Sequence, residues 1–277
     1  MHANIIQIFC SPYHRIFALE KADMADKAWY KDWFNSPYYH LLYQHRDEEE
    51  ANQFIKTLIN YLKPAKGSLM LDVACGKGRH SIALSDMGYE VTGIDLSGAS
   101  ISEAKLQESD QLHFFQHDMR LPFWINYYQY VFNFFTSFGY FKTRREHDNS
   151  IRTMAQSLQK GGLVVIDYLN VHYAEQHEEK IFTTTIEGVT FHITKWQDEF
   201  HFFKQIQITD DENKTPKHLH TERVAKFSLG DFNDMLAYQG MQIEEVFGDY
   251  QLAKYNVNSS PRLIILARKN KYLQPVT

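Results

Sequence analysis

Residues 69–97 constrain the possible fold of this chain more than any other stretch. They divide into an apolar run, a break that contains glycines, a helical pattern and a second apolar run, at 69–73, 74–78, 79–87 and 89–94. Gly76 and Gly78 permit positive φ and let a ligand approach the backbone, and Gly88 ends the helix. Short runs that are apolar throughout are typical of strands buried on both faces, so the pattern predicts a βαβ unit. Asp95, which ends the second run, should then lie at the same sheet edge as the glycine loop, where open α/β sheets bind ligands.

The rest of the sequence continues this alternation of helical and strand patterns. Helices are expected at 47–62, 100–107, 144–159 and 229–239. Further strands of the same sheet are expected at 111–116, 127–135, 163–166, 241–247 and 262–267. Only a loop separates the last two strands, so they should pair antiparallel. The alternation predicts an α/β fold, a doubly wound, seven-stranded, mostly parallel sheet of the Rossmann-like type with the last strand antiparallel.

The pattern changes between residues 181 and 227, where strand-like segments follow one another with no helix between them. Gly188 and the polar cluster at 210–213 are typical of turns. This stretch predicts an antiparallel β insertion after the fifth strand. The expected parts of the chain are an N-terminal extension, a core, the insertion and the completion of the core sheet, at 1–23, 24–180, 181–227 and 228–277.

An aromatic segment at 27–46 precedes the first helix of the core. It is rich in Trp, Tyr and His, and Pro37 interrupts it, so we expect two short helical pieces rather than one long helix. Such pieces could cover the ligand edge of the sheet. The apolar run at 5–10 in the preceding extension is too short for a good signal peptide.

Charge and cysteine content exclude several classes of protein. The net charge of −5 and the pI near 6.3 argue against a wide nucleic-acid surface, which requires clustered Lys and Arg. The two cysteines, Cys10 and Cys75, are too few for a disulfide framework. Such low cysteine usage is typical of proteins in the reducing cytoplasm. No apolar run approaches the roughly 18 residues of a membrane span. We expect a cytoplasmic protein, monomeric or homodimeric, with neither DNA nor a membrane as partner.

A set of ordered motifs then narrows the ligand. The motifs lie at 71–78, 93–97, 117–119 and 133–140, with closing segments at 247–249 and 260–265. In this order and spacing they resemble the class I S-adenosylmethionine-dependent methyltransferases, of the small bacterial methyltransferase-domain type. The resemblance extends over roughly residues 38–269. It implies an enzyme that uses S-adenosyl-L-methionine as its cofactor and transfers the methyl group by in-line displacement.

The resemblance also implies which residues hold this donor. Asp72 would accept from the ammonium, Asp95 would bind the ribose hydroxyls, and Asp118 would accept from the adenine amine. The backbone of Gly76 would cradle the methionyl part, and Arg46 would lie near its carboxylate, although a surface pairing of Arg46 with the following acidic helix remains an alternative. The full set implied is Asp72, Ala74, Cys75, Gly76, Gly78, Arg46, Asp95, Leu96, Asp118, Met119, Asn133 and Phe134.

Two other interpretations of the sequence are less well supported. A nicotinamide-binding loop needs a third glycine three residues after Gly78, where this chain has Ser81. His218 and His220 would share one face of a strand, with His192 or His201 opposite, but no cysteine or close carboxylate completes a metal site. We therefore expect neither a dehydrogenase nor a bound metal.

The methyl acceptor is the least constrained part of the prediction. Residues 133–136 occupy the place where amino-directed DNA methyltransferases carry an Asn/Asp-Pro-Pro-aromatic motif, and both prolines are missing. Together with the acidic net charge, this argues against DNA as the acceptor. The insertion at 181–227 lies where several small-molecule methyltransferases of this class place a lid, so the resemblance implies that it serves as a lid or a substrate region and that the acceptor is a small molecule. A protein or RNA acceptor, or binding of the donor without catalysis, are the alternatives. Residues that follow strand ends on the ligand edge, or that end the insertion, could line the acceptor pocket: Ser137, Tyr140, Tyr168, His172 and Arg223. Core packing is the alternative for these side chains, and no catalytic residue is assigned.

Overall fold

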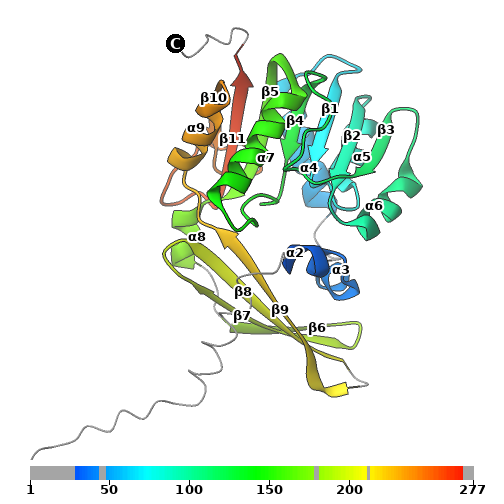
Figure 1. Ribbon diagram of the computed structural model, residues 1–277, viewed down its shortest axis with the longest axis vertical. Helices are drawn as coiled ribbons and strands as arrows, with labels where there is room; N and C mark the ends of the chain where they lie inside the picture. Colours follow the sequence, from blue (N-terminus) through cyan, green and yellow to red (C-terminus); the bar gives the residue numbers. More distant parts are fainter. Residues whose placement is uncertain (1–28, 44–47, 178–180, 211–212, 271–277) are drawn as a thin grey trace, which may run out of the picture.

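The computed structural model describes residues 29–43, 48–177, 181–210 and 213–270, which form two separate β-sheets (Figure 1). The larger sheet has the strand order β10-β11-β5-β4-β1-β2-β3. Its strands are β1 Leu69–Val73, β2 Glu90–Asp95, β3 Leu112–Gln116, β4 Tyr128–Asn133, β5 Leu158–Leu169, β10 Met241–Phe247 and β11 Arg262–Lys269. Neighbouring strands are parallel except where β11 is one of the pair. This arrangement confirms the predicted doubly wound sheet with its last strand antiparallel.

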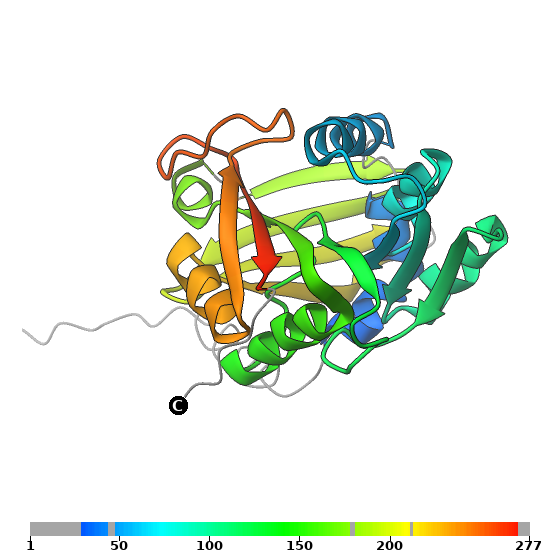
Figure 2. The ribbon, with the colours of Figure 1, turned by 90° about the horizontal axis from the view of Figure 1, so that it is seen from above.

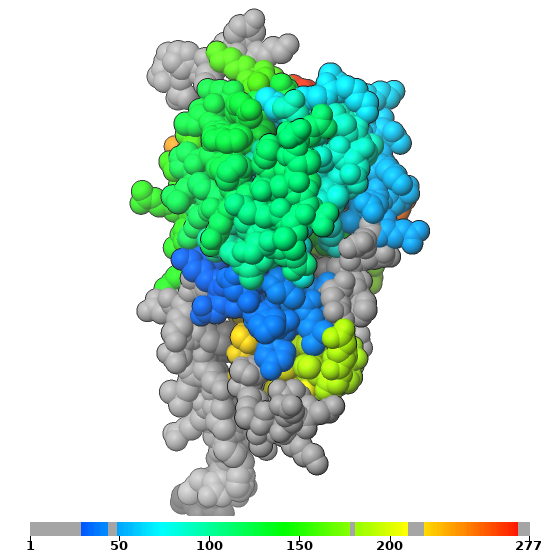
Figure 3. Space-filling model, turned by 90° about the vertical axis from the view of Figure 1, so that its right-hand side faces the viewer, coloured from blue at the N-terminus to red at the C-terminus, as the bar shows by residue number. Residues whose placement is uncertain are grey.

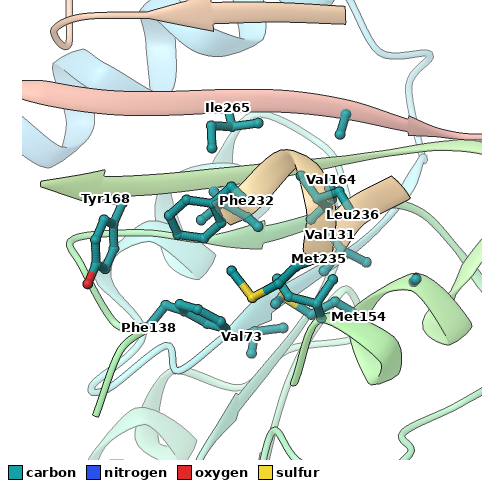
Figure 4. Packing of buried hydrophobic residues seen from close by; sticks show 14 of the residues in the cluster. Val73, Val131, Phe138, Met154, Val164, Tyr168, Phe232, Met235, Leu236 and Ile265 are labelled. Atoms are coloured by element: carbon teal, nitrogen blue, oxygen red, sulfur yellow. The ribbon is translucent and has the colours of Figure 1, made fainter. Parts of the chain in front are cut away.

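Helices cover both faces of the larger sheet, which sandwiches it between two hydrophobic cores (Figure 2). One face carries α4 Glu48–Leu62, α5 Arg79–Asp86, α6 Gly98–Ala104 and the short 3₁₀ helix η1 Lys105–Gln107. The other carries α7 Arg144–Ser157 and α9 Leu229–Tyr238. On this second face Phe232 and Met235 of α9 pack with Phe138, as Figure 4 shows. Strands that are buried on both sides explain the uninterrupted apolar runs of the sequence.

The smaller sheet lies beyond the carboxyl ends of the parallel strands (Figure 1). Its strands are β6 Ile181–Ile186, β7 Val189–Gln197, β8 His201–Asp210 and β9 Asn213–Ala225, paired antiparallel in that order. This sheet confirms the predicted insertion after the fifth core strand. The sequence pattern did not predict the connecting helix α8 Val171–His177, and β5 is longer than expected because it continues into paired residues on either side of its apolar centre.

Two short helices, α2 Trp29–Phe34 and α3 Pro37–Tyr43, lie between the larger sheet and the smaller one (Figures 1 and 3). They correspond to the two helical pieces expected on either side of the Pro37 interruption. Pro37 is the first residue of α3, where its missing N–H costs no hydrogen bond. Trp33 of α2 is fully buried against apolar side chains of the smaller sheet, so this sheet and the two helices share a third hydrophobic core.

Candidate active site

The glycine loop between β1 and α5 forms the floor of the site. Gly76 has φ +58°, and a Cβ added there would meet no atom within 4 Å, so the backbone is open on that side. Gly78 has φ +86°, and a Cβ there would lie 2.5 Å from the ring of Phe114 in β3. The two glycines therefore serve different purposes. Gly76 leaves room at the cavity, and Gly78 allows close packing beneath the loop.

The Asp95 carboxylate at the end of β2 is bound to this loop. Its Oδ2 accepts from the Gly76 N–H at 2.9 Å, and its Oδ1 accepts from the Ser97 N–H at 2.7 Å. Burial raises the pKa of Asp95, and the backbone N–H groups of Ser97 and Gly76 act in the opposite direction because they stabilise the charged form. The parallel pairing of β1 with β2 places these groups side by side, as the βαβ pattern predicted.

Two adjoining cavities lie above the loop and share part of their walls. The shared residues are Tyr39, Ala74, Gly76, Ser100, Phe135 and Ser137. The first cavity is also lined by Asp95, Leu96, Asp118, Met119 and Tyr140. The second is also lined by Cys75, Lys77, Arg79, His80 and Phe134. The shared wall joins the two cavities into one elongated site across the carboxyl edge of the sheet.

A charged network includes Asp118, which lines the first cavity. Asp118 accepts from both Nε and Nη2 of Arg120, at 3.0 and 2.6 Å, and Nη1 of Arg120 donates to Glu146 at 2.5 Å. Burial opposes ionisation of Asp118, but the hydrogen bonds and charge of Arg120 outweigh it, so the pKa of this carboxyl lies below its usual value. The carboxylate is therefore charged and fixed in orientation at neutral pH.

The second cavity has a basic and aromatic wall. The Arg79 guanidinium lies 4.2 Å from the centre of the Phe135 ring, and Lys77 pairs with Glu103 at 2.7 Å. His80 is buried beside this wall, and its Nε2 has no hydrogen-bond partner among the described residues. Burial lowers the pKa of His80 to about 3, with the charge of Arg79 acting in the same direction, so the imidazole is neutral.

Aromatic side chains of α2 and α3 roof the first cavity. Tyr30, Phe34 and Tyr39 line it from these helices, and Phe34 packs edge-to-face on Tyr140 with ring centres 5.4 Å apart. The helices are fixed to the larger sheet through Asn35, whose side-chain oxygen accepts from the Ser97 hydroxyl at 3.0 Å. Ser97 caps α6, and its backbone N–H binds Asp95. The roof is thus attached two residues from the carboxylate at the floor of the cavity.

The structure brings most of the predicted donor residues to the cavity walls, but it places Asp72, Gly78 and Asn133 elsewhere. The Asp72 carboxylate is buried and accepts from the Ser81 hydroxyl at 2.6 Å, which joins β1 to α5. Asn133 is also buried, and its Nδ2 donates to the Val73 carbonyl at 2.9 Å. These polar groups lie beneath the loop and hold it in shape. Arg46, the remaining predicted residue, lies outside the described residues.

The predicted acceptor residues divide in the same way. Ser137 and Tyr140 line the cavities, whereas Tyr168 is fully buried and donates to the Ala225 carbonyl, which joins β5 to the end of β9. His172 is exposed on α8, away from both cavities. Nη2 of Arg223 lies at the edge of hydrogen-bonding distance from the Phe141 carbonyl, at 3.4 Å, and this side chain lines neither cavity. The side chain of a residue that follows a strand can point toward the cavity or into the core, depending on the local backbone conformation. Position at a strand end therefore did not predict by itself which of these residues line the cavities.

Sequence reasoning missed several residues of the site. These are Tyr30, Phe34, Tyr39, Ser97, Ser100, His117, Arg79 and Arg120. Arg79 and Arg120 directly follow two of the recognised motifs, so a basic residue beside a motif was an available signal. For Tyr30, Phe34 and Tyr39 the only signal was the aromatic density of the segment, which predicted a cover without selecting its members.

The described part of the chain contains no group of three or more His, Cys, Asp or Glu side chains arranged to hold a metal ion. It also contains no helix that is long and apolar enough to span a membrane.

Comparison with known proteins defines the class. Residues 70–162 match the family model of the methyltransferase domain. The chain is 26% identical over 244 residues to YqeM of Bacillus subtilis, named as a methyltransferase, with 84% of this chain and 95% of the relative covered. It is 33% identical over 132 residues to dTDP-3-amino-3,4,6-trideoxy-alpha-D-glucopyranose N,N-dimethyltransferase of Streptomyces venezuelae, with 47% of this chain and 54% of the relative covered.

Solved structures share the fold. An S-adenosylmethionine-dependent methyltransferase from Clostridium acetobutylicum superposes with a TM-score of 0.69 at 15% identity, covering 92% of this chain and 99% of that one. The sugar N-methyltransferase KedS8 from a Streptoalloteichus species gives 0.65 at 20% identity, covering 84% and 92%. The fold, the motifs and the sequence matches together support a class I S-adenosylmethionine-dependent methyltransferase. It is an enzyme, and S-adenosyl-L-methionine is its cofactor.

Proposed function

We propose that the two cavities hold S-adenosyl-L-methionine along the carboxyl edge of the sheet, and that the methyl group passes to a small-molecule acceptor. The adenosine end would lie in the first cavity, with its ribose hydroxyls on Asp95. A carboxylate has about four lone-pair sites, and the backbone N–H groups of the loop use only part of them. Leu96 and Met119 would flank the adenine, and Asp118 would accept from its amine.

The methionyl end would lie over the open backbone of Gly76 and extend into the second cavity. The absence of any atom near a Cβ built at Gly76 supports this fit, because the ligand needs that space. Arg79, whose guanidinium lies over the Phe135 ring in the wall of the second cavity, would bind the carboxylate. The sulfonium would then lie near the shared wall, where the ring faces of Tyr39 and Phe135 favour a cation.

The donor supplies a methyl group on a sulfonium, whose leaving group is a neutral thioether. The protein must align donor and acceptor and exclude water, and such alignment contributes on the order of 7–11 kcal/mol. The roof of Tyr30, Phe34 and Tyr39 suits both tasks, because it buries the cavity under rigid rings. A general base is required only if the acceptor arrives protonated, and the proposal assigns none.

The aromatic cover over the site is the observation that carries the proposal of a small acceptor. Rings of α2 and α3 line the first cavity, and the smaller sheet lies beyond these helices (Figure 1). A folded protein or an RNA helix requires an open surface beside the reacting atom. The similarity over part of the chain to an enzyme named for an amino-sugar nucleotide makes amines on sugar-sized molecules the first acceptors to examine.

Release of S-adenosylhomocysteine in the presence of candidate acceptors tests this proposal. The panel comprises amino-sugar nucleotides, small amines and small phenols, with bulk RNA and unfolded protein as the macromolecular arm. We expect turnover above the background rate with a member of the small-molecule arm and none with the macromolecules. Turnover confined to RNA or protein would contradict the proposed acceptor class, and no binding of the donor at millimolar concentration would contradict the proposed site.

A further inference from the structure

The carboxylate of Glu222 in β9 binds the roof of the site. Oε1 of Glu222 accepts from the Trp33 indole N–H at 2.8 Å and from the Tyr43 hydroxyl at 2.7 Å. The two donors come from α2 and α3, so a single atom of the smaller sheet holds both helices. The residues joined by these two bonds are 189 and 179 positions apart in the chain.

The groups around Trp33 and Tyr43 also hold these two side chains in place. Trp33 is fully buried and stacks on His220, with ring centres 4.3 Å apart and planes 28° apart. Tyr43 also accepts from Nζ of Lys204 in β8 at 2.5 Å, and this Nζ lies 4.6 Å from the centre of its ring. Hydrogen bonds from two aromatic donors to a carboxylate are of the strong, charge-assisted kind.

The position of the roof decides the shape of both cavities. Tyr39 lies between Trp33 and Tyr43 in the chain, packs on both rings at centre distances of 5.6 and 4.8 Å, and lines both cavities. In the turn between α2 and α3, the roof binds Ser97 through Asn35. Release of the Glu222 contacts would therefore free both helices from the smaller sheet, while the turn between them stayed attached to the larger sheet.

We propose that Glu222 is a positioning residue. Through Trp33 and Tyr43 it fixes Tyr39 over the junction of the two cavities, so that the smaller sheet and the roof close the site as one unit. This inference rests on the proposed function, because it assumes that the donor and its product lie beneath Tyr39. It predicts that loss of the Glu222 contacts speeds the exit of the bound product.

The experiment compares Glu222→Ala with Glu222→Gln in the full chain. The glutamine keeps a carbonyl oxygen that accepts from both aromatic donors, whereas alanine removes it. The rate of S-adenosylhomocysteine dissociation is measured by stopped-flow tryptophan fluorescence, with excess S-adenosylmethionine as the competitor. Glu199→Ala, which removes an exposed carboxylate from the turn between β7 and β8, is the control.

We expect dissociation to be about tenfold or more faster for Glu222→Ala, and within about threefold of the parent for Glu222→Gln and Glu199→Ala. If alanine destabilises the smaller sheet, Tyr43→Phe removes one of the two bonds and should give an intermediate rate. Equal rates for the parent, Glu222→Ala and Tyr43→Phe would overturn the inference, as would a glutamine variant as fast as alanine. Failure of the parent protein to bind the product would instead overturn the proposed function.

Discussion

The substitution Asp72→Asn is expected to change how the stability of the protein depends on pH. Burial raises the pKa of Asp72 from its usual 3.8 to about 6, although the Ser81 hydroxyl donates to it and lowers the pKa in part. A carboxyl whose pKa is higher in the folded state favours folding while it is protonated. That contribution is present at low pH and is lost as the pH rises through about 6.

The size of the effect follows from the rise of the pKa. Each pKa unit corresponds to about 1.4 kcal/mol, so the free energy of unfolding should fall by about 3 kcal/mol between full protonation and full ionisation of Asp72. Between pH 5 and pH 8, where the protein is easier to handle, the expected change is about 1.4 kcal/mol. Asparagine keeps an oxygen that can accept from Ser81 and carries no charge at any pH, so the variant should lose this dependence.

Urea unfolding followed by circular dichroism at pH 5, 6, 7 and 8 measures this difference directly. The free energy of unfolding of Asp72→Asn relative to the parent should rise by about 1.4 kcal/mol across the series. Asp86→Asn, an exposed carboxylate at the end of α5, should show no such trend. The argument that burial opposes ionisation of Asp72 would be refuted if the difference in unfolding free energy between Asp72→Asn and the parent stayed constant with pH, or fell as the pH rose.

Three further substitutions test the site and its support. Asp95→Ala should weaken binding of S-adenosylmethionine by about 1–3 kcal/mol in calorimetry, because it removes a charged acceptor. Gly78→Ala should lower the free energy of unfolding by about 2–5 kcal/mol, through backbone strain at its positive φ and overpacking against Phe114. Gly76→Ala should cost only the backbone strain, about 1–2 kcal/mol, but block the donor. Arg262→Ala should destabilise the fold by about 3–5 kcal/mol in urea unfolding, because it leaves the buried Asp167 without its partner at 2.6 Å.

Each of these predictions has its own control or its own contrary outcome. If Asp95→Ala bound the donor as tightly as the parent, the proposal that Asp95 binds the ribose hydroxyls would be wrong. A Gly78→Ala variant that loses no more stability than Gly76→Ala would show that Phe114 can move aside, because both variants carry the strain of a positive φ. For the buried pair, Arg268→Ala is the matched control, since it breaks an exposed pair with Glu244 and should cost at most about 1 kcal/mol. A loss at Arg262 no larger than at Arg268 would contradict the argument from burial.

The floor of the site could be predicted because it depends on local sequence. The strand, glycine loop and helix of residues 69–86 are consecutive, and a parallel crossover brings the end of β2 beside the loop. The contact of Asp95 with Gly76 follows from these elements almost without reference to the rest of the chain. The insertion could also be predicted, because successive strands joined by short turns, with no helix between them, favour antiparallel pairing with one another.

The roof could not be predicted, because it depends on contacts between distant segments. Which rings of α2 and α3 face the cavity is decided by the fit of these helices against the smaller sheet, through Trp33 and Glu222. The fates of Tyr168 and Arg223 were undetermined for a related reason. Tyr168 is buried in the core, where it donates to the Ala225 carbonyl at the end of β9. Arg223 lies outside the cavities, because the register of β9 decides which face of the sheet each residue occupies.

The sequence by itself therefore determined the class of the fold, the donor and the carboxylate expected to bind its ribose, since each follows from residues close together in the chain or from motifs with fixed spacing. Only the tertiary structure decided that Asp72 and Asn133 support the loop from below and that α2 and α3 enclose the cavities. It also decided that Glu222 binds that roof. Side chains from separate elements acquire a common environment only when those elements pack, and no local pattern in the sequence encodes that packing.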